Sequence, residues 1–316
     1  MDNPYRTKTV VMGNGEPVKK RRHHHVWQEY LRAWAQPDGK ILCKMHGKII
    51  PTGTSQVAVE SFFYKIPRLT EADVALIRFL VIDVNAVHPR TRKAHEDFLA
   101  LVTAPTAYEG ESEEVDDLIH TFRCNALEDY HAGIEGAFLP LLKRALEKDL
   151  SFYADEQSCI SLFLFLASQH MRTKGIRVKT IDRVRTGNGL DISRVWIVMS
   201  HMLAFNIGMG RFLARKKIRL VLVENATDLE FIAGDQPLIN LHGDGETSPD
   251  TLSWYYPISP RLALLLPEVG EEPVISTATL TSEQVRKLNL HMAAASHRQV
   301  FAHSRFTLDA LSAPIR

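Results

Sequence analysis

The sequence predicts an α+β protein in which a mostly helical centre packs on a small, largely antiparallel sheet built from strands near both ends of the chain. Apolar residues recur every three or four positions between about residues 70 and 216, which is the helical period. From about 217 to 305, short apolar runs alternate with turn residues, as strands do. Similar short runs precede residue 65. Helices and strands segregated in this way are typical of the α+β class.

Composition indicates a soluble globular chain. The 316 residues are 45% hydrophobic and 24% charged, and the formal net charge of +1 argues against a wholly basic nucleic-acid binder. Charge is nevertheless unevenly distributed: residues 1–25 and 172–185 are basic, and residues 109–117 are acidic. Such runs are usually solvated faces, so they raise the expectation of a nucleic-acid or phosphate partner only modestly.

Cysteine usage and hydropathy predict a cytoplasmic protein. Cys43, Cys124 and Cys159 lie far apart and form no metal-ligand spacing, which is typical of a reducing compartment. The longest apolar run, Cys159 to Ala167, is about half the length that a membrane-spanning helix needs. No membrane partner is therefore expected.

The N-terminal residues divide into an arm and the start of the fold. Residues 1–22 contain glycine, proline and a basic cluster, and we expect a flexible arm followed by one α+β domain over 23–316. His23 and His24 stand at or just before a short helix whose apolar residues are 27, 30, 31 and 34. Neutral imidazole is a common metal ligand. The alternatives are a solvated cluster, histidines bonded to backbone, or a fragment of a purification tag.

The next elements are two strands and an interrupted helical region. Residues 39–50 predict two strands turned around His46-Gly47, and residues 55–64 a third strand or an extended linker. The helical pattern of 71–101 is interrupted near His88-Pro89, since the residue before proline avoids helical backbone. Arg90 and His95 in this stretch resemble the Arg-x4-His motif of helical ribonuclease toxins, although one such pair is common by chance.

Two central helices carry the next candidate residues. Residues 114–148 predict a long helix in which Glu135 stands beside the buried stripe. Residues 155–173 predict a helix that is apolar on all sides and therefore central to the core, with Gln169 and Arg172 on one face at its end. These two side chains could hold an anion, or Arg172 could simply face the helix dipole.

The C-terminal part predicts strands around an acidic residue. Residues 191–216 are helical, and Gly208-Met-Gly210 lacks the third glycine of a dinucleotide fingerprint. Residues 218–223 and 229–233 predict a hairpin whose second arm ends at Asp235, two residues before a proline. Asp235 is thus expected at the mouth of a sheet, either as a functional carboxylate or as the cap of a turn. Residues 254–260 follow, with two prolines that bracket Ile258-Ser259 and suggest an edge or a tight corner beside the Asp235 loop. A further strand at 262–266, a helix at 282–296 and a closing strand at 299–303 complete the pattern.

Several of these stretches together resemble a bacterial family known as domain of unknown function four-two-three-eight. Its HHxVPxxYLRxF motif corresponds to residues 23–34, its Q-x-x-R-[TS] helix end to residues 169–173, and its SDxPV and PLSP elements to residues 234–238 and 257–260. The chain departs from the pattern at Trp27, where the family has proline, and at Gly234, where it has serine. It also departs at His25, which takes the place of an aromatic residue.

The resemblance implies no established activity, but it places the candidate residues in one pattern and so implies a shared pocket. We expect a metal-dependent phosphodiester hydrolase, a nuclease-like effector acting on nucleic acid or a nucleotide in bacterial stress or phage defence. A divalent ion would be held by two or more of the ligands, and the remaining polar residues would bind phosphate and orient water. The ligand candidates are His23, His24, Asp235 and Glu135, and the other catalytic candidates are Gln169 and Arg172.

A second hypothesis is a non-enzymatic sensor or partner-binding protein. The same residues would then form a buried hydrogen-bond network that pins the N-terminal segment, with Arg172 paired to Asp235 or Glu135. A third is a metal-independent helical ribonuclease using Arg90 and His95 across a dimer. Partner proteins or a homodimer stay open under these alternatives.

Overall fold

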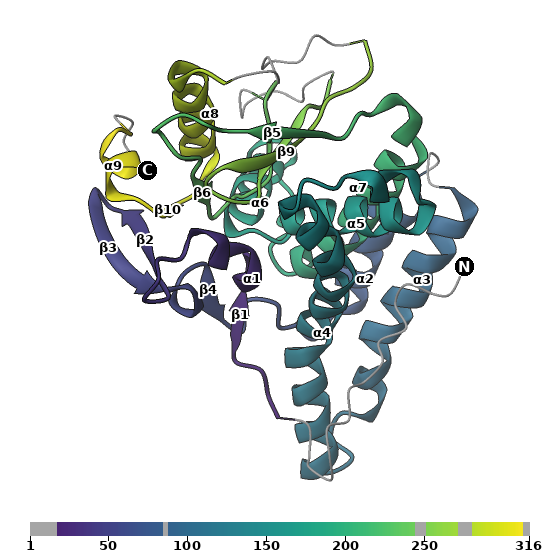
Figure 1. Cartoon of the computed structure of the whole chain (residues 1–316). Helices are drawn as coiled ribbons and strands as arrows, with labels where there is room; N and C mark the ends of the chain where they lie inside the picture. Colours follow the sequence, from purple (N-terminus) through teal and green to yellow (C-terminus); the bar gives the residue numbers. More distant parts are fainter. Residues whose placement is uncertain (1–17, 85–87, 244–250, 271–279, 312–316) are drawn as a thin grey trace.

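Helices from the middle of the chain pack against strands from its two ends (Figure 1). The computed structural model describes residues 18–84, 88–243, 251–270 and 280–311. The mixture of helices with small antiparallel sheets confirms the predicted α+β class. The predicted arm falls mostly at residues 1–17, outside the described residues; its last part, residues 18–22, lies against the long central helix.

The first elements form two strand pairs. β1 (Arg22–His24) pairs antiparallel with β4 (Val59–Ser61), and between them come α1 (Gln28–Leu31), the 3-10 turns η1 (Arg32–Trp34) and η2 (Thr54–Gln56), and a hairpin. The hairpin joins β2 (Lys40–Met45) to β3 (Lys48–Gly53) through His46 and Gly47, whose φ angles are 49° and 74°. Two left-handed central residues give the turn that matches strand twist. The predicted hairpin is therefore confirmed.

One sheet joins the two ends of the chain. Its order is β3-β2-β10-β6, with β10 (Val300–Ala302) lying antiparallel between β2 and β6 (Ala233–Gly234). Ala233, Phe301 and Ile41 are all fully buried in this region. The prediction of a sheet assembled from N- and C-terminal strands is confirmed.

A second sheet corrects the predicted hairpin at 218–233. Its order is β5-β9-β8-β7, formed by β5 (Val221–Glu224), β9 (Leu262–Leu266), β8 (Trp254–Pro257) and β7 (Ile239–Asn240). β5 pairs with β9, so the hairpin prediction was wrong. The backbone of 229–232 bonds elsewhere: Phe231 N–H donates to Pro260, and Ile232 N–H donates to the Asn289 side chain.

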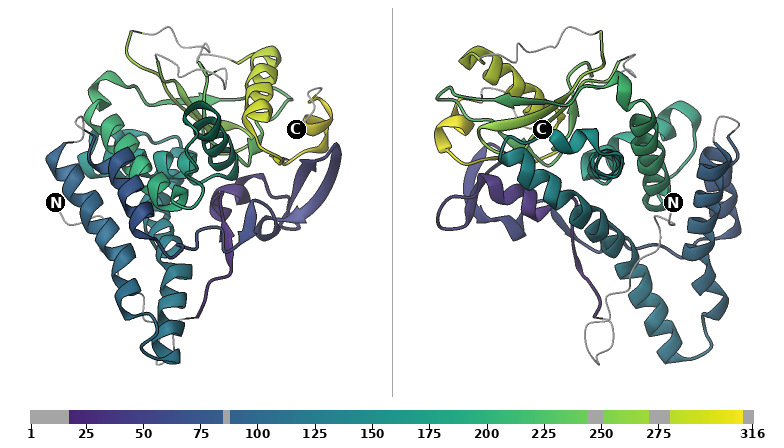
Figure 2. Two further views of the ribbon diagram at one scale, coloured as in Figure 1. Left: turned by 180° about the vertical axis from the view of Figure 1, so that it is seen from behind. Right: turned by 45° about the vertical axis from the view of Figure 1, so that its right-hand side comes forward.

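Two long helices, α3 (Pro89–Thr103) and α4 (Glu113–Leu146), extend away from the sheets to a tip (Figure 2). α2 (Glu71–Ile77) and the π-helix η3 (Arg78–Ile82) precede them, and the 3-10 turn η4 (Ala104–Tyr108) joins them. Pro89 is the first residue of α3, where its missing N–H has no intrahelical partner to lose. The expected interruption near His88-Pro89 is thus present, and the α3–η4–α4 turn forms the tip.

α5 (Glu156–Met171) lies at the centre of the helical layer. It follows the 3-10 turn η5 (Ser151–Ala154) and packs along α7 (Trp196–Leu213), where a Cβ added at Gly208 would lie 3.1 Å from Leu164 Cα. Gly208 therefore serves close helix packing. α6 (Lys174–Asn188) accounts for most of the basic 172–185 run; the 3-10 turn η6 (Arg215–Lys217), α8 (Ser282–Ala295) and α9 (Arg305–Asp309) complete the chain.

Candidate functional site: a buried network around Arg172

Arg172 is a buried cation at the end of α5. Its side chain is 5% exposed, and its Nη1 lies 2.7 Å from Oε1 of Glu135 on α4. Its Nη2 donates to Oε1 of Gln169, one turn earlier on α5, at 2.7 Å. Burial alone would lower the pKa of Arg172, but Glu135, Tyr64 and Glu128 together outweigh burial and raise this pKa. The guanidinium is therefore charged, paired and removed from solvent, the condition under which a buried charge is tolerated.

Gln169 fixes the histidine-bearing segment to α5. Its Oε1 also accepts from Trp27 N–H at 3.2 Å, and its Nε2 donates to the His25 carbonyl at 3.0 Å. The side chain is fully buried. One amide thus bonds the backbone on both sides of Val26, which links the first strand region to the Arg172–Glu135 pair.

α4 contributes two further polar residues that sequence analysis did not single out. They are Glu128 and His131. His131 is three residues after Glu128 and four before Glu135, so the three side chains share one face of the helix. Burial raises the pKa of Glu128 to about 7; Arg172 opposes this shift and Glu135 adds to it. Burial also raises the pKa of Glu135, against the pull of Arg172. The Glu-x2-His-x3-Glu spacing in the sequence could have indicated that these three side chains lie on one face of α4.

A small cavity adjoins the guanidinium. It has a volume of about 10 Å³ and is lined by Arg172, Tyr64, His131 and His201, together with smaller and apolar side chains. This is room for about one water molecule. The rings of His131 and His201 lie 5.1 Å apart, and burial lowers the pKa of both, that of His201 to about 3. Both imidazoles are therefore neutral near pH 7.

The three consecutive histidines at the end of β1 and just after it are buried to different extents. His23 is fully buried; its Nδ1 accepts from Tyr64 N–H at 2.8 Å, and its Nε2 lies 3.0 Å from the Lys20 carbonyl. These partners define a neutral ring with the proton on Nε2. Burial lowers the pKa of His24, which is half-buried, and lowers that of His25 to about 3.

The Asp235 carboxylate accepts hydrogen bonds from the turn at residues 297–299, about sixty residues later in the sequence. Its Oδ1 accepts from His297 N–H at 2.7 Å, and its Oδ2 accepts from Arg298 and Gln299 N–H at 2.9 and 3.1 Å. Burial raises the pKa of Asp235, and these three bonds oppose the shift. Within the described part of the chain, no hydrogen bond or ion pair joins Asp235 to Arg172. Asp235 therefore belongs to the β6–β10 junction, at the end of a strand as expected, and caps the turn after α8.

A metal would compete with existing hydrogen bonds at the predicted ligands. Both ring nitrogens of His23 and both carboxylate oxygens of Asp235 are already engaged. Among residues 18–84, 88–243, 251–270 and 280–311, no group of three or more His, Cys, Asp or Glu side chains is arranged to hold a metal ion. The proposed ligand set thus fits a cation poorly in this arrangement and stays a prediction.

The Arg90 and His95 pair is split between two faces of α3. Residues five apart lie roughly 140° apart around a helix. His95 is fully buried, its Nε2 is 2.7 Å from Oδ1 of Asn206 on α7, and Arg90 is exposed. The imidazole therefore packs between helices and does not reach a surface shared with Arg90.

The three cysteines are free and buried. Over the described ranges, no helix combines the length and the apolar character needed to cross a membrane.

The fold and this network define an α+β protein organised around a buried Arg–Glu–Gln centre that ties the N-terminal strand region to two central helices. The chain belongs to the family described as "Protein of unknown function (DUF4238)", whose sequence profile matches residues 22–306. The family resemblance is thereby confirmed. No match was found among curated proteins or solved structures.

Proposed function

We propose that this chain is a non-enzymatic sensor or partner-binding protein and that the Arg172 network is its structural centre. The observation that carries the proposal is the use of Gln169 and Arg172: their side chains bond to Trp27, His25, Glu135 and each other, all within the protein. A catalytic arginine would direct its terminal donors at a substrate site, whereas both terminal nitrogens of Arg172 bond within the protein and its buried Nε has no partner among the described residues.

The space around the network supports the same proposal. The cavity beside Arg172 holds about 10 Å³, whereas small-molecule sites commonly have volumes of about 300–1,000 Å³. Asp235 is likewise occupied by three backbone N–H groups. Under this proposal the partner is a protein, and the network sets the position of β1 and the residues that follow it.

The second candidate is a nuclease-like phosphodiester hydrolase in bacterial stress or phage defence. It is favoured by Glu128, whose pKa of about 7 would suit a general acid or base, beside the positive charge of Arg172. Its partner would be nucleic acid or a nucleotide. His23 and Asp235 are poor ligands for a divalent ion in this arrangement, because their ring nitrogens and carboxylate oxygens already take part in hydrogen bonds.

Cleavage and stability measured together distinguish the two candidates. Purified wild type and the Glu128→Gln and Gln169→Leu variants would be incubated with single-stranded RNA, single-stranded DNA and plasmid DNA in magnesium, manganese or chelator, and unfolded in urea. We expect no cleavage by any of them and a loss of stability in Gln169→Leu. Wild-type cleavage that Glu128→Gln abolishes without loss of stability would establish the hydrolase and overturn the proposal.

The metal prediction has its own measurement. Thermal unfolding of wild type and His24→Ala would be compared in chelator and with magnesium, manganese or zinc added. A bound ion at a hundredfold excess over its Kd stabilises by about 2.7 kcal/mol. We expect no ion-specific shift; a shift in wild type that is lost in His24→Ala would establish a histidine metal site.

A further inference from the structure

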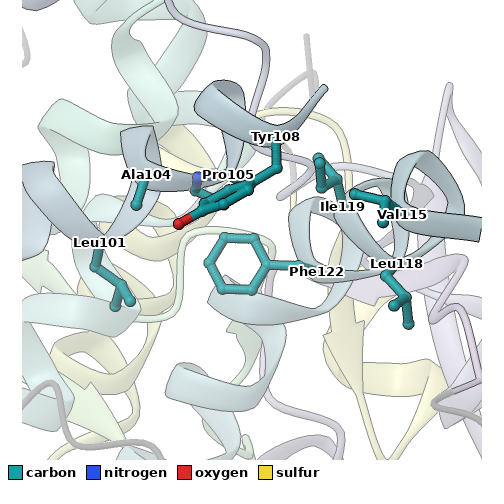
Figure 3. Close-up of a pocket in the computed structure, with 8 residues that line it drawn as sticks. All are labelled: Leu101, Ala104, Pro105, Tyr108, Val115, Leu118, Ile119 and Phe122. Atoms are coloured by element: carbon teal, nitrogen blue, oxygen red, sulfur yellow. The ribbon is translucent and has the colours of Figure 1, made fainter. Parts of the chain in front are cut away.

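We propose that the groove at the tip of α3 and α4 binds a basic, apolar-containing peptide segment of a partner protein. Eight residues line this groove, which has a volume of about 370 Å³ (Figure 3): Leu101, Ala104, Pro105, Tyr108, Val115, Leu118, Ile119 and Phe122. The inference deepens the proposed function, on which it rests, by naming the kind of partner and a surface separate from the Arg172 network.

The groove exposes large apolar side chains. Leu101 is 42% exposed, Tyr108 56% and Leu118 50%, and their neighbours Pro105 and Phe122 continue the same wall. On α4, Val115, Leu118, Ile119 and Phe122 follow the i, i+3, i+4, i+7 spacing of one helix face. In the part of the chain that the structure describes, no α-helix covers that face at the tip, and contiguous exposed apolar surface of this kind marks interaction sites.

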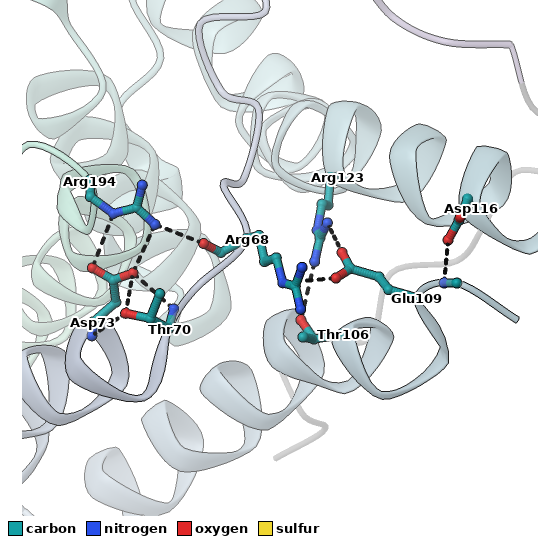
Figure 4. Close-up of polar contacts among 9 residues, drawn as sticks. Arg68, Thr70, Asp73, Thr106, Glu109, Asp116, Arg123 and Arg194 are labelled. Carbon is teal, nitrogen blue, oxygen red and sulfur yellow. Dashed lines mark hydrogen bonds and ion pairs between the residues drawn. The ribbon is translucent and has the colours of Figure 1, made fainter.

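Polar contacts hold the two walls of the groove in place. Glu109, just after η4, accepts from Arg123 on α4 and also pairs with Arg68 at 2.9 Å, while Arg123 donates to Thr106 at 3.1 Å (Figure 4). Gly110 N–H donates to Asp116 at 2.9 Å. Residues that do not themselves line the groove thus hold η4 against α4. A preformed groove lowers the entropic cost of binding an extended or helical segment.

The charge beside the groove selects a basic partner. The acidic run that precedes and begins α4 gives the tip a negative charge. Glu111 stands just before the helix, and Glu114 is one turn before Leu118 on the same side of it; both are exposed. Glu113 and Asp117 lie on the other side of the helix, where Asp117 pairs with Lys19. Opposite potentials across an interface favour encounter and exclude like-charged partners. Lysine or arginine residues flanking an apolar stretch therefore match both the groove and its border.

This helix already holds one basic segment. Lys19 pairs with Asp117 at 2.5 Å and Lys20 pairs with Asp129. Asn125 bonds the backbone on both sides of Lys19, donating to the Val18 carbonyl at 2.9 Å and accepting from Lys20 N–H at 2.8 Å. α4 thus binds extended basic chain through carboxylates and one amide, and the groove offers an apolar complement on another side of the turns that carry Asp117.

Fluorescence anisotropy with a labelled probe peptide tests the proposal on the full chain. The probe is a short amphipathic peptide of leucine and lysine, and its control replaces every leucine by serine. We expect the probe to bind wild type and the control to bind at least about tenfold more weakly. Leu118→Asn and the double variant Glu111→Lys, Glu114→Lys should each weaken probe binding by about tenfold or more. The matched controls Leu213→Asn and Glu283→Lys, exposed on α7 and α8, should leave it unchanged.

Four results would overturn the proposal. The first is that the probe does not bind, and the second is that it binds wild type and Leu118→Asn equally. The third is that the serine control binds as tightly as the probe. The fourth is that the probe binds more tightly to a chain carrying Val10→Ser and Val11→Ser, because residues 1–17 would then be the occupant of the groove. Sedimentation adds a fifth: a wild-type dimer that Leu118→Asn dissociates makes a second copy the occupant. Failure of the proposed function appears separately, as nucleic-acid cleavage that depends on Glu128.

Discussion

Arg172 Nη1 and Glu135 Oε1 lie 2.7 Å apart where the end of α5 meets α4, and the two side chains are 5% and 19% exposed. This pair is the ionic centre of the molecule, because Gln169 connects it to the backbone at His25 and Trp27. Removing one partner leaves the other charge buried without compensation.

The first prediction concerns that pair. Glu135→Ala should lower the free energy of unfolding by about 3–5 kcal/mol, because the Arg172 guanidinium stays buried without its carboxylate. Urea unfolding measures the change. The control is Asp309→Ala, which breaks an exposed i,i+4 pair with Arg305 and should change stability by less than about 0.5 kcal/mol. Equal effects of the two substitutions would contradict the assigned role of Glu135.

Gln169 gives a second prediction. Gln169→Leu should cost about 2–4 kcal/mol, because the His25 carbonyl and Trp27 N–H are left buried without partners. Hydrogen exchange should increase at the Trp27 amide in particular. Gln169→Glu keeps an acceptor for Trp27 and Arg172 but cannot donate to His25, so its loss should be smaller. Unchanged exchange at Trp27 in Gln169→Leu would show that the amide does not hold this segment.

Asp235 is predicted to act on stability alone. Asp235→Asn removes the charge that accepts from His297, Arg298 and Gln299 N–H, and it should lower stability by about 1–3 kcal/mol. The loss should be the same in chelator and in magnesium. A loss seen only when the metal is present would assign Asp235 to a metal site.

The pH dependence of stability tests Glu128. Burial raises its folded pKa to about 7 from an ordinary value of 4.5, so the folded state binds this proton more tightly than the unfolded state. The stabilising contribution is complete below pH 4.5 and is lost as the pH rises through 7. Glu128→Gln should therefore match wild type near pH 4 and exceed it by about 3 kcal/mol at pH 8. Glu114→Gln, at an exposed position on the same helix, should differ from wild type by the same amount at pH 4 and at pH 8. A wild type more stable than Glu128→Gln at pH 8 would contradict the raised pKa of Glu128.

Gly234 and Ser296 provide a prediction with an internal rescue. A Cβ added at Gly234 would lie 2.0 Å from Ser296 Oγ, which donates to the Met292 carbonyl. Gly234→Ala should cost about 1–3 kcal/mol through overpacking. Combining it with Ser296→Ala removes the clashing oxygen and should recover most of that loss. A double variant no more stable than Gly234→Ala would place the strain in the backbone.

Much of the fold could be predicted because its elements are specified locally. The α4 and α5 helices follow from their apolar period, and the β2–β3 hairpin follows from the turn residues His46 and Gly47. The hairpin at 218–233 failed because β5 obtained its partner from β9, about forty residues later. Strand partners at such distances depend on tertiary packing, which propensity does not encode.

The candidate site residues likewise divide into those whose contacts are local in sequence, which could be predicted, and those whose contacts are distant, which could not. Arg172 and Gln169 were placed together because they share one turn of α5, and Glu135 is one of the two partners expected for Arg172. His131 and His201 were missed, since a buried neutral histidine on an apolar face looks like any core position. The turn after α8 that Asp235 caps lies about sixty residues away, beyond the reach of local pattern.

The position of β10 between β2 and β6 also determines when this sheet can form during synthesis of the chain. The β2–β3 hairpin leaves the ribosome roughly 250 residues before β10, so at about 5–20 residues per second its inner edge waits on the order of ten seconds or more for its partner. An unpaired strand edge is a template for association with other chains. Newly made chains are therefore exposed to wrong pairing at β2 until β10 has been synthesised, and slowing elongation between residues 53 and 300 should increase aggregation more than slowing it before residue 40.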